Sequence, residues 1–445
     1  MKKIILSAAV AAMAFSTSAV AADKGIDIDV TGQATLYYET HSGNGTNDKG
    51  YASQASSTAS AGIQLNLGSD LGNNFTFGSQ ITYLGSLGLG KDIVSATKQT
   101  AGTEGNTRDE LALTKIFIAK QIANTTLKMG RQELPKSLSP LAFTEGWNVY
   151  KNTFDAILAV NTDLPKTTLV GAYVTGGTGM SLGTTGDLVG KTTAGTTGVN
   201  GAAFMLTAQT KLIPMTTLTL SYYDLKSVDG DAGTSLIANE EIGMKAYWAD
   251  AQIAPKDAPL GLKVALQAGK LAPDSTLGAA TFEDTDAFGA KVTAKVAGVA
   301  LKAIYTSVSD VSTGKHAVSV QNTGTGIKSP LYSQMMYNQN MISLDSDTVV
   351  LGAAYNMGDM GTVAANYGMT TMGNRNLAAN TAIAGDTDYN ELDLVYKVKS
   401  GGVQYFAIAA IRDIDTGGTM NTTTSANNTG MTEDTVIRFW ARYNF

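Results

Sequence analysis

Cationic side chains recur on one face of several segments in which apolar and polar residues alternate. Because successive side chains of a β-strand point to opposite faces, these cations would project away from the apolar face: Lys128, Lys245, Lys263, Lys291, Lys295, Lys302, Lys397, Lys399, Arg412, Arg438 and Arg442. Rings of fixed charge are how pores select ions. The pattern therefore predicts selection of charged solutes, if the strands that carry the cations surround a water-filled path.

One connecting segment, residues 133–155, mixes acidic and basic side chains where other connections are rich in Gly, Thr and Asn. Its charged residues are Glu133, Lys136, Glu145, Lys151 and Asp155. Opposite a basic wall, its carboxylates would create a transverse field at the narrowest section of a pore. The alternative is that many of these charges only keep the interior hydrated.

Catalytic chemistry has weaker support in the sequence. The stretch "GMSLG" (179–183) matches G-x-S-x-G, but it lies in a Gly/Thr-rich segment without the strand-to-helix turn that exposes a hydrolase nucleophile. His41 and His316 are the only histidines, and the chain has no cysteine. Candidates for a general base or nucleophile are therefore few. An outer-membrane esterase is the enzyme alternative, and we expect the chain not to be an enzyme.

Cofactor and nucleic-acid sites are not predicted either. "DIDTGG" (413–418) is similar to the start of a calcium loop, but Gly417 and Thr424 stand where that loop needs ligands. "LVGKT" (188–192) lacks the first glycine of a phosphate-binding loop, and the Met-rich residues 334–341 are more typical of packing than of metal binding. A pI near 5.1 and a net charge of −6 argue against nucleic acid as a partner.

The elements that must position the charges are strands. Apolar and polar residues alternate with period two, as in a strand with different environments on its two faces, in residues 26–39, 59–67, 74–83, 217–223, 241–248, 260–269, 287–296 and 392–399. About 9 to 11 tilted residues cross the hydrocarbon core of a membrane. These segments are therefore of the length that a membrane-spanning barrel requires.

The start of the chain predicts export from the cytoplasm. Lys2 and Lys3 precede a short apolar run, and small residues follow up to Ala21. This order is typical of a secretory signal peptide. We therefore expect residues 1–21 to be removed and residues 22–445 to form the mature protein.

The last eight residues, "RFWARYNF", alternate strictly between two faces and end on Phe445. A terminus that is aromatic and patterned is expected to be anchored rather than frayed. In a barrel, this strand would close against the first one, and its ring would belong to the aromatic girdle at the membrane boundary. Such an end also resembles the signal that the outer-membrane assembly machinery reads.

Composition favours one large unit. There are 48 Gly, 8 Pro and no Cys, and charged residues make up 16% of the chain, below the usual quarter. Beyond the signal no apolar run is long enough for a transmembrane helix, so a membrane location would require a closed barrel, which leaves no strand edge unpaired.

The connections between the strands alternate in length. Short breaks take turns with long Gly/Thr/Asn/Asp-rich stretches at 41–58, 85–110, 176–200, 309–345 and 412–432. Short periplasmic turns and long external loops are typical of outer-membrane barrels. The sequence therefore predicts an all-β antiparallel barrel of about eighteen strands. A secreted β-sandwich is the alternative, although sandwiches have about seven to nine strands.

Three stretches resemble the OprD-like (Opr) family of outer-membrane porins, including the major porin type of Gram-negative relatives. They are "KMGRQELPKSLSPLAF" (128–143), "GWNVYKNTFDAILAVNTDLPKTTLVGAYV" (146–174) and the terminal "RFWARYNF". The resemblance implies an eighteen-stranded channel in which the third external loop, here residues 133–152, folds inward as a constriction. It also implies a basic inner wall that guides anionic solutes.

The function we expect is that of an outer-membrane porin for passive diffusion of ions and small hydrophilic solutes. The expected constriction residues are Glu133, Lys136, Glu145, Lys151 and Asp155, and the expected wall residues are Lys263, Lys291, Lys295, Lys302, Arg412, Arg438 and Arg442. Expected partners are outer-membrane lipid, diffusing solutes, two further copies in a homotrimer, and the assembly machinery through Phe445. A channel specific for small carboxylates or other anions is the alternative within transport, and a surface adhesin is an alternative outside it.

Overall fold

The computed structural model describes residues 27–43, 50–100, 107, 109–182, 188–192, 195–199, 203–225, 243–274, 276–277, 280–312, 315–373, 376–377, 381–382, 387–416 and 433–445. The expected signal peptide, residues 1–21, lies outside these ranges. Within them, no helix has the length and apolar content needed to cross a bilayer.

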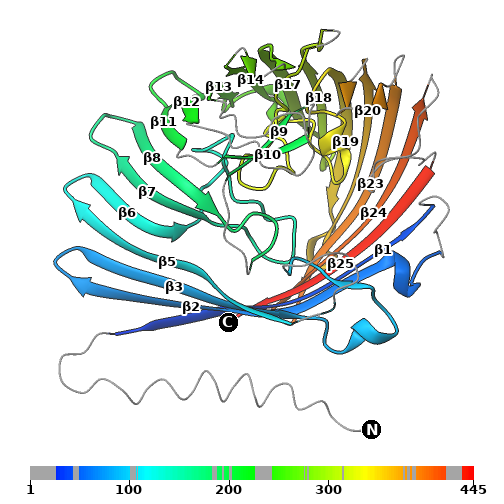
Figure 1. Cartoon of the computed structure of the whole chain (residues 1–445), viewed down its shortest axis with the longest axis horizontal. Helices are drawn as coiled ribbons and strands as arrows, with labels where there is room; N and C mark the ends of the chain where they lie inside the picture. The colour runs from blue at the N-terminus through cyan, green and yellow to red at the C-terminus, as the bar shows by residue number, and fades with distance from the viewer. Residues whose placement is uncertain are drawn as a thin grey trace.

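Eighteen antiparallel strands form a closed barrel, as predicted. They are β1 (Asp29–Ser42), β2 (Ser57–Gly72), β3 (Phe75–Gly85), β5 (Glu110–Ile122), β6 (Thr125–Gln132), β7 (Phe154–Asn161), β8 (Thr167–Gly177), β11 (Ala203–Thr210), β12 (Thr216–Leu225), β13 (Met244–Ile253), β14 (Lys263–Pro273), β17 (Thr285–Val296), β18 (Val299–Val308), β19 (Ser346–Asn356), β20 (Thr362–Met372), β23 (Thr387–Ser400), β24 (Val403–Thr416) and β25 (Glu433–Asn444). Each strand pairs with its neighbours in the chain, and β25 pairs with β1. In Figure 1 the red last strand lies beside the blue first one.

Several of the long connections contain short strands. They are β4 (Ala96–Thr97), β9 (Leu188–Thr192) with β10 (Gly195–Val199), β15 (Thr276–Leu277) with β16 (Ala280–Thr281), and β21 (Asn376–Leu377) with β22 (Thr381–Ala382). β4 adds to β2 in parallel, and the other pairs are small hairpins. Helical structure in the described residues consists of 3₁₀ turns of three residues.

The two ends of the barrel differ in their connections. Short turns, such as residues 73–74, 123–124 and 297–298, join strands at one end, which we call the turn end. The other end, called the loop end, carries the long connections, and β1 and β25 place both described termini at the turn end. This alternation of short and long connections is the predicted one, and it is the arrangement of outer-membrane barrels.

Side-chain alternation separates the two faces of the wall. In β1, Leu36 is 49% exposed on the outside while Tyr37 is 2% exposed inside. In β25, Ile437 and Phe439 face outward, and Arg438 between them is 1% exposed. Large apolar residues therefore cover the outer face, as lipid contact requires.

Cysteine labelling tests this assignment of faces. Lys263 and Lys291 share the inward parity of β14 and β17, whereas Val264 and Val292 have the outward parity. Since the natural chain has no cysteine, a single introduced cysteine is the only reactive thiol. In the membrane-embedded protein, we expect cysteines at Lys263 and Lys291 to react with a water-soluble maleimide, and cysteines at Val264 and Val292 to be protected by lipid. Equal labelling of both pairs would contradict the assigned orientation.

One part of the wall departs from the rule that polar residues face inward. In β13 the inward residues are Met244, Ala246 and Trp248, all buried, whereas Lys245 and Tyr247 are exposed on the outside. The prediction that Lys245 lines the pore is therefore wrong. Its apolar neighbours can face inward because long connections fill this side of the barrel and cover them, forming one apolar cluster with residues such as Leu141.

The barrel closes through its last residue. The amide of Phe445 donates to Gly32 O at 3.0 Å, and the amide of Gly32 donates to Phe445 O at 2.6 Å. A Cβ atom at Gly32 would lie 2.4 Å from Cζ of Phe445, so the ring occupies space that only glycine leaves free. The terminal residue is thus part of the sheet, as the patterned end of the sequence predicts.

Candidate pore constriction

Two connections from the loop end fold into the barrel. The first inner loop, residues 133–153, joins β6 to β7, and the second inner loop, residues 309–345, joins β18 to β19. In Figure 1 both lie inside the ring of strands. Leu141 and Val149 of the first and Val320 and Ile342 of the second are buried. The inward course of the first loop is the predicted one.

The prediction that residues 309–345 form an external loop is wrong. Their apolar side chains pack against the inner wall and the first inner loop, within the same cluster that contains Met244 and Trp248. A loop of this length with its own apolar residues is stabilised by burying them. The constriction is therefore built from two loops rather than one.

Glu145 joins the two inner loops. Its carboxylate accepts hydrogen bonds from Asn322 Nδ2 at 2.7 Å and the Lys328 amide at 3.1 Å, and also from Thr325 Oγ1 and Trp147 Nε1. The residue is 4% exposed. A buried carboxylate with four donors is well compensated for the loss of water. Glu145 lies in the inner loop as expected, but its carboxylate is a junction between loops and does not face water.

The side chain of Lys328 fixes the second inner loop to itself. Its Nζ donates to Met335 O at 3.0 Å and Met336 O at 2.6 Å. The side chain is buried, and burial lowers the pKa of Lys328 from its ordinary 10.5 to about 8, although the nearby Glu145 opposes this shift. When the second inner loop packs inside the barrel, which we call docking, Lys328 enters an environment in which its charged form is less favourable than in water.

This depressed pKa predicts that docking of the second inner loop depends on pH. A lysine with a pKa of about 8 when docked and near 10.5 when exposed to water releases protons on docking, so docking becomes more favourable as pH rises through that window. We expect open-channel noise from loop movement to decrease between pH 7 and pH 10. Lys328→Met, recorded in the same buffers, should lose this dependence. A pH response that survives the substitution would assign it to another group.

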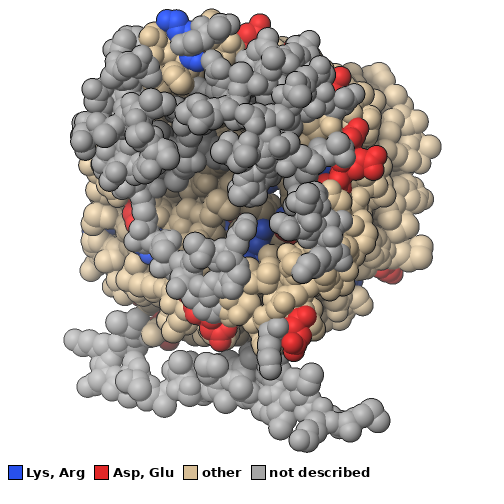
Figure 2. Space-filling view, turned by 45° about the vertical axis from the view of Figure 1, so that its right-hand side comes forward, with Lys and Arg blue, Asp and Glu red and all other residues tan. Residues whose placement is uncertain are grey.

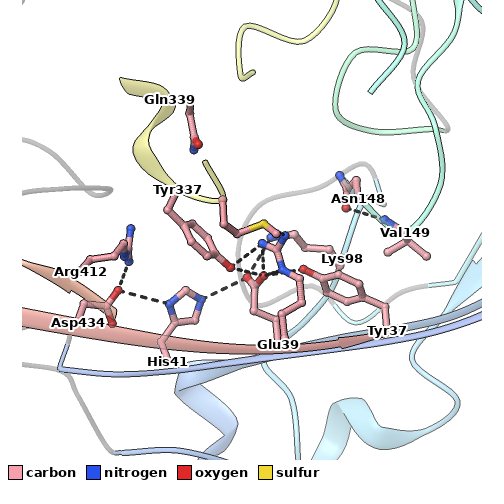
Figure 3. A network of polar contacts seen from close by, with 12 residues as sticks. Tyr37, Glu39, His41, Lys98, Asn148, Val149, Tyr337, Gln339, Arg412 and Asp434 are labelled. Carbon is pink, nitrogen blue, oxygen red and sulfur yellow. Dashed lines mark hydrogen bonds and ion pairs between the residues drawn. The ribbon is translucent and has the colours of Figure 1, made fainter. Parts of the chain in front are cut away.

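A second polar network joins the inner loops to the barrel seam, which is the place where β1 pairs with β25 (Figure 3). Glu39 of β1 is 2% exposed and accepts from Tyr37 Oη at 2.6 Å, Tyr337 Oη at 2.9 Å and Lys98 Nζ at 3.4 Å. It also forms an ion pair with Arg438 of β25. The wall strands β1 and β25, the second inner loop and the 86–109 connection therefore meet at one carboxylate.

His41 and Asp434 extend this network towards the loop end. His41 Nε2 lies 3.3 Å from Glu39 Oε1, and its Nδ1 lies 3.9 Å from Asp434 Oδ2. Asp434 in turn forms an ion pair with Arg412. Arg412 and Arg438, predicted as pore-wall cations, are thus buried in ion pairs and carry no free charge into the lumen.

The remaining predicted loop charges lie closer to water. Glu133 forms ion pairs with Lys115 of β5 and with Lys151 Nζ at 2.9 Å. Burial alone would raise the pKa of Glu133, but the two lysines outweigh it and hold the pKa below its usual value. Lys136 is exposed, and its Nζ donates to Ser329 O at 3.2 Å in the second inner loop. Glu133, Lys136 and Lys151 are therefore grouped at the inner loops.

Asp155 is the exception among the predicted constriction residues. It belongs to β7, where it alternates with the inward-facing Phe154 and Ala156, and so it lies on the outer face. Arg131 of β6 stands opposite it, and Arg131 Nε lies 2.8 Å from Asp155 Oδ1. Placing Asp155 at the constriction is therefore wrong, because the strand begins one residue before it and turns its side chain outward.

Four predicted wall lysines face the lumen, and one predicted arginine holds a loop. Lys263, Lys291, Lys295 and Lys302 have inward parity in β14, β17 and β18, and Lys291 Nζ lies 4.2 Å from the ring centre of Tyr332 in the second inner loop. Arg442 donates to Asn148 O at 2.7 Å and Val149 O at 3.0 Å in the first inner loop. In Figure 2 cationic side chains are visible within the central opening of the molecule.

The weak sequence motifs occupy ordinary structural positions. Ser181 of "GMSLG" follows β8 in a turn and donates to Thr100 O at 3.4 Å, and Gly183 lies outside the described residues. "LVGKT" is β9 of a small hairpin. Asp413 to Thr416 of "DIDTGG" are paired residues of β24, and the rest of that stretch lies outside the described residues. Within the Met-rich stretch, Met335 and Met341 are buried in apolar clusters.

Sequence reasoning missed three residues that organise the interior. Asp434, Lys328 and Tyr337 were not singled out, because each contacts a residue outside its own stretch of sequence: Arg412 for Asp434, Glu145 for the Lys328 amide and Glu39 for Tyr337. For Lys328 and Tyr337, the sequence did contain an indication of a buried segment. The segment 315–345 combines apolar residues with polar ones over a length that an external loop does not need.

Comparison with known proteins agrees with this architecture. No protein-family model and no curated protein matches the sequence. Among solved structures from Pseudomonas aeruginosa, OccK9 (OpdG) aligns with a TM-score of 0.70 at 15% identity, covering 94% of this chain and 98% of that chain. OpdK with vanillate gives 0.69 at 14% identity, covering 95% and 100%, and OccK8 (OprE) gives 0.67 at 15%, covering 94% and 98%.

These similar structures are outer-membrane porins of the OprD family. At such identities the alignments establish the fold, and they extend over nearly the whole of both chains. The fold implied by the three resembling stretches, an eighteen-stranded barrel with a loop folded into the lumen, is thus confirmed.

Proposed function

We propose that the protein is an outer-membrane porin, a water-filled channel for passive diffusion of ions and small hydrophilic solutes. The observation that carries this proposal is the combination of an apolar outer face with inward-facing lysines, Lys263, Lys295 and Lys302, for which the described part of the chain provides no carboxylate partner. Free cations inside a closed wall need water, and an apolar outer face needs lipid. The turn end then faces the periplasm and the loop end faces outward.

Single-channel recording tests this function. The protein purified from outer membranes, added to a planar bilayer, should give stepwise increases in conductance that scale with salt concentration. An adhesin barrel needs no continuous water path, and the same preparation would then bind membranes without conductance steps. Heat-denatured protein is the matched control, since it contains the same chain without the barrel.

A selective channel for anionic solutes is the second candidate. It is supported by the excess of unpaired lysines over carboxylates on the inner wall near the turn end, and by the similarity in fold to OpdK, whose structure contains vanillate. Liposome swelling with uncharged and anionic solutes of equal size separates the two candidates. A general porin admits both at similar rates, and a selective channel admits the anion faster.

We further propose that residues 1–21 act as a signal peptide and that the mature protein is a homotrimer. The assembly machinery would recognise Phe445, whose place in the sheet next to Gly32 supports the need for this terminal residue. Enzyme activity is not part of the proposal. The fold is shared with channels, and Ser181 lies in a turn rather than at a strand-to-helix elbow.

A further inference from the structure

Cations in the lumen differ in their pairing along the pore axis. Towards the loop end and at the inner loops, five cations lie within 4.0 Å of a carboxylate: Lys98, Lys115, Lys151, Arg412 and Arg438. Lys136 and Lys328 of the inner loops donate to backbone carbonyl oxygens instead. Towards the turn end, the described residues provide no such partner for Lys263, Lys295, Lys302, Lys397, Lys399 or Arg442. Most of the cations of the described wall that have no carboxylate partner therefore lie on the turn-end side of the inner loops, and Lys291 lies beside Tyr332 of the second inner loop.

Part of this region is a distinct cavity of about 570 Å³. Three cations and four aromatic residues contribute to its lining: Lys397, Lys399 and Arg442, and Trp147, Tyr405, Phe406 and Trp440. The residues that line it include no aspartate or glutamate. We call this cavity the turn-end vestibule.

Two buried donors of the vestibule have no acceptor. Trp440 is 5% exposed, and neither its Nε1 nor Nε of Arg442 has a hydrogen-bond partner in the described part of the chain. Buried donors of this kind are rare in folded proteins, and each calls for a partner such as water or a ligand. The guanidinium of Arg442 is held in place, because its Nη2 donates to Asn148 O and Val149 O.

The aromatic rings add a flat apolar surface next to these donors. Phe406 and Trp440 meet at 4.6 Å between ring centres, and Lys397 Nζ lies 5.0 Å from the centre of the Phe406 ring. A planar organic anion could place its acid group at the cations and its ring against these faces. An inorganic anion would use only the charges.

The inner loops form one wall of this vestibule. Gly146 and Trp147 come from the first inner loop and Met336 from the second. A solute from the turn end therefore reaches the vestibule directly, whereas a solute from the loop end must first pass the constriction. A pore with unpaired charge at one end also concentrates counter-ions at that end.

We propose that the turn-end vestibule is a binding site for planar organic anions that fills more readily from the turn end, and that it makes the channel conduct asymmetrically. This inference rests on the proposed porin function. It adds a ligand class, a location and a direction to that function. It places anion recognition below the inner loops rather than among the charges of the constriction.

Side-specific block of single channels tests the proposal. The blocker is 2-naphthalenesulfonate, and methanesulfonate is the control that has the acid group without the ring. We expect naphthalenesulfonate added at the turn end to reduce the current at a concentration about tenfold below that needed at the loop end. Methanesulfonate should block weakly from both sides. In symmetrical salt without blocker, currents at opposite voltages should differ in size.

Three variants locate the effect. Lys399→Gln and Trp440→Phe should each weaken block from the turn end, by about tenfold for the loss of a charged or donating partner. Lys256→Gln removes the same charge from an exposed turn outside the vestibule and should leave the block unchanged. The orientation of each channel is read afterwards from a cysteine at Gln404, which lines the vestibule and reacts with a bulky maleimide from the turn end.

The outcomes separate this inference from the proposed function. Conducting channels that are blocked equally from both sides, or in which Lys256→Gln has the same effect as Lys399→Gln, would overturn the vestibule and leave the porin standing. Stronger block from the loop end would place the site in the constriction or above it. Absence of conductance would overturn the porin function and, with it, the inference.

Discussion

Deletion of Phe445 is expected to reduce the yield of folded barrel to a small fraction of normal. The deletion removes two backbone hydrogen bonds to Gly32 and the contact of the ring with the glycine backbone. Two hydrogen bonds at about 1 kcal/mol each and partial burial of an aromatic ring together contribute about 3 kcal/mol to closure. The measurement is the heat-modifiable fraction on a gel, in which folded barrels migrate faster than unfolded chains.

Two further variants separate closure from recognition by the assembly machinery. Gly32→Val keeps the terminal residue intact but fills the space that its ring occupies, so it should impair closure of purified protein refolded in detergent. Phe288→Ala removes an outward aromatic residue far from the seam and should fold normally. Normal folded yield from both the Phe445 deletion and Gly32→Val would contradict the role of this contact.

The wall of the barrel could be predicted from the sequence, because the side chains of a strand alternate between two environments and this alternation is visible within a few consecutive residues. Each strand has one face on the outside of the barrel and one towards its interior, so side chains two apart share an environment. The alternation at Leu36 and Tyr37, and at Phe439 and Arg438, reports this directly. The terminal Phe445 carries the same information. The number of strands follows from the alternation of short and long connections, which also identified the first inner loop.

The interior could not be predicted in the same way, because its environment depends on segments distant in sequence. Alternation shows that Arg438 points inward, but not that Glu39, 399 residues away, neutralises it. It also assigns Lys245 to the lumen, since an apolar face normally means lipid. The second inner loop reverses that rule for β13 by covering Trp248 from inside.

The same distinction applies to the charges of the constriction. Composition marked residues 133–155 as unusual, and four of the five predicted residues, Glu133, Lys136, Glu145 and Lys151, lie in the first inner loop. Whether a carboxylate there faces water depends on its partners. Glu145 is surrounded by four donors, three of them from a loop more than 170 residues later in the chain.

Replacing Glu145 by lysine is therefore expected to enlarge the channel. If Glu145 faced water, the charge reversal would only shift selectivity towards anions. Its carboxylate instead holds Asn322, Thr325 and the Lys328 amide. Removing one partner from a buried charged group typically costs about 3 to 5 kcal/mol, and the new cation would also repel Lys328. We expect both inner loops to leave the lumen, which raises the single-channel conductance and admits larger polyethylene glycols.

Matched variants distinguish a lost junction from a changed charge. Glu145→Gln keeps an oxygen for the donors of the second inner loop but presents an amide N–H to Trp147 Nε1, so its effect should be smaller than that of lysine. Asp257→Lys reverses a charge on the exposed turn between β13 and β14 and should change neither the conductance nor the polymer cut-off. A Glu145→Lys channel of normal conductance with a shifted reversal potential would contradict the prediction. That result would place the carboxylate in the water path, and the two inner loops would then have to be held together by their apolar contacts alone.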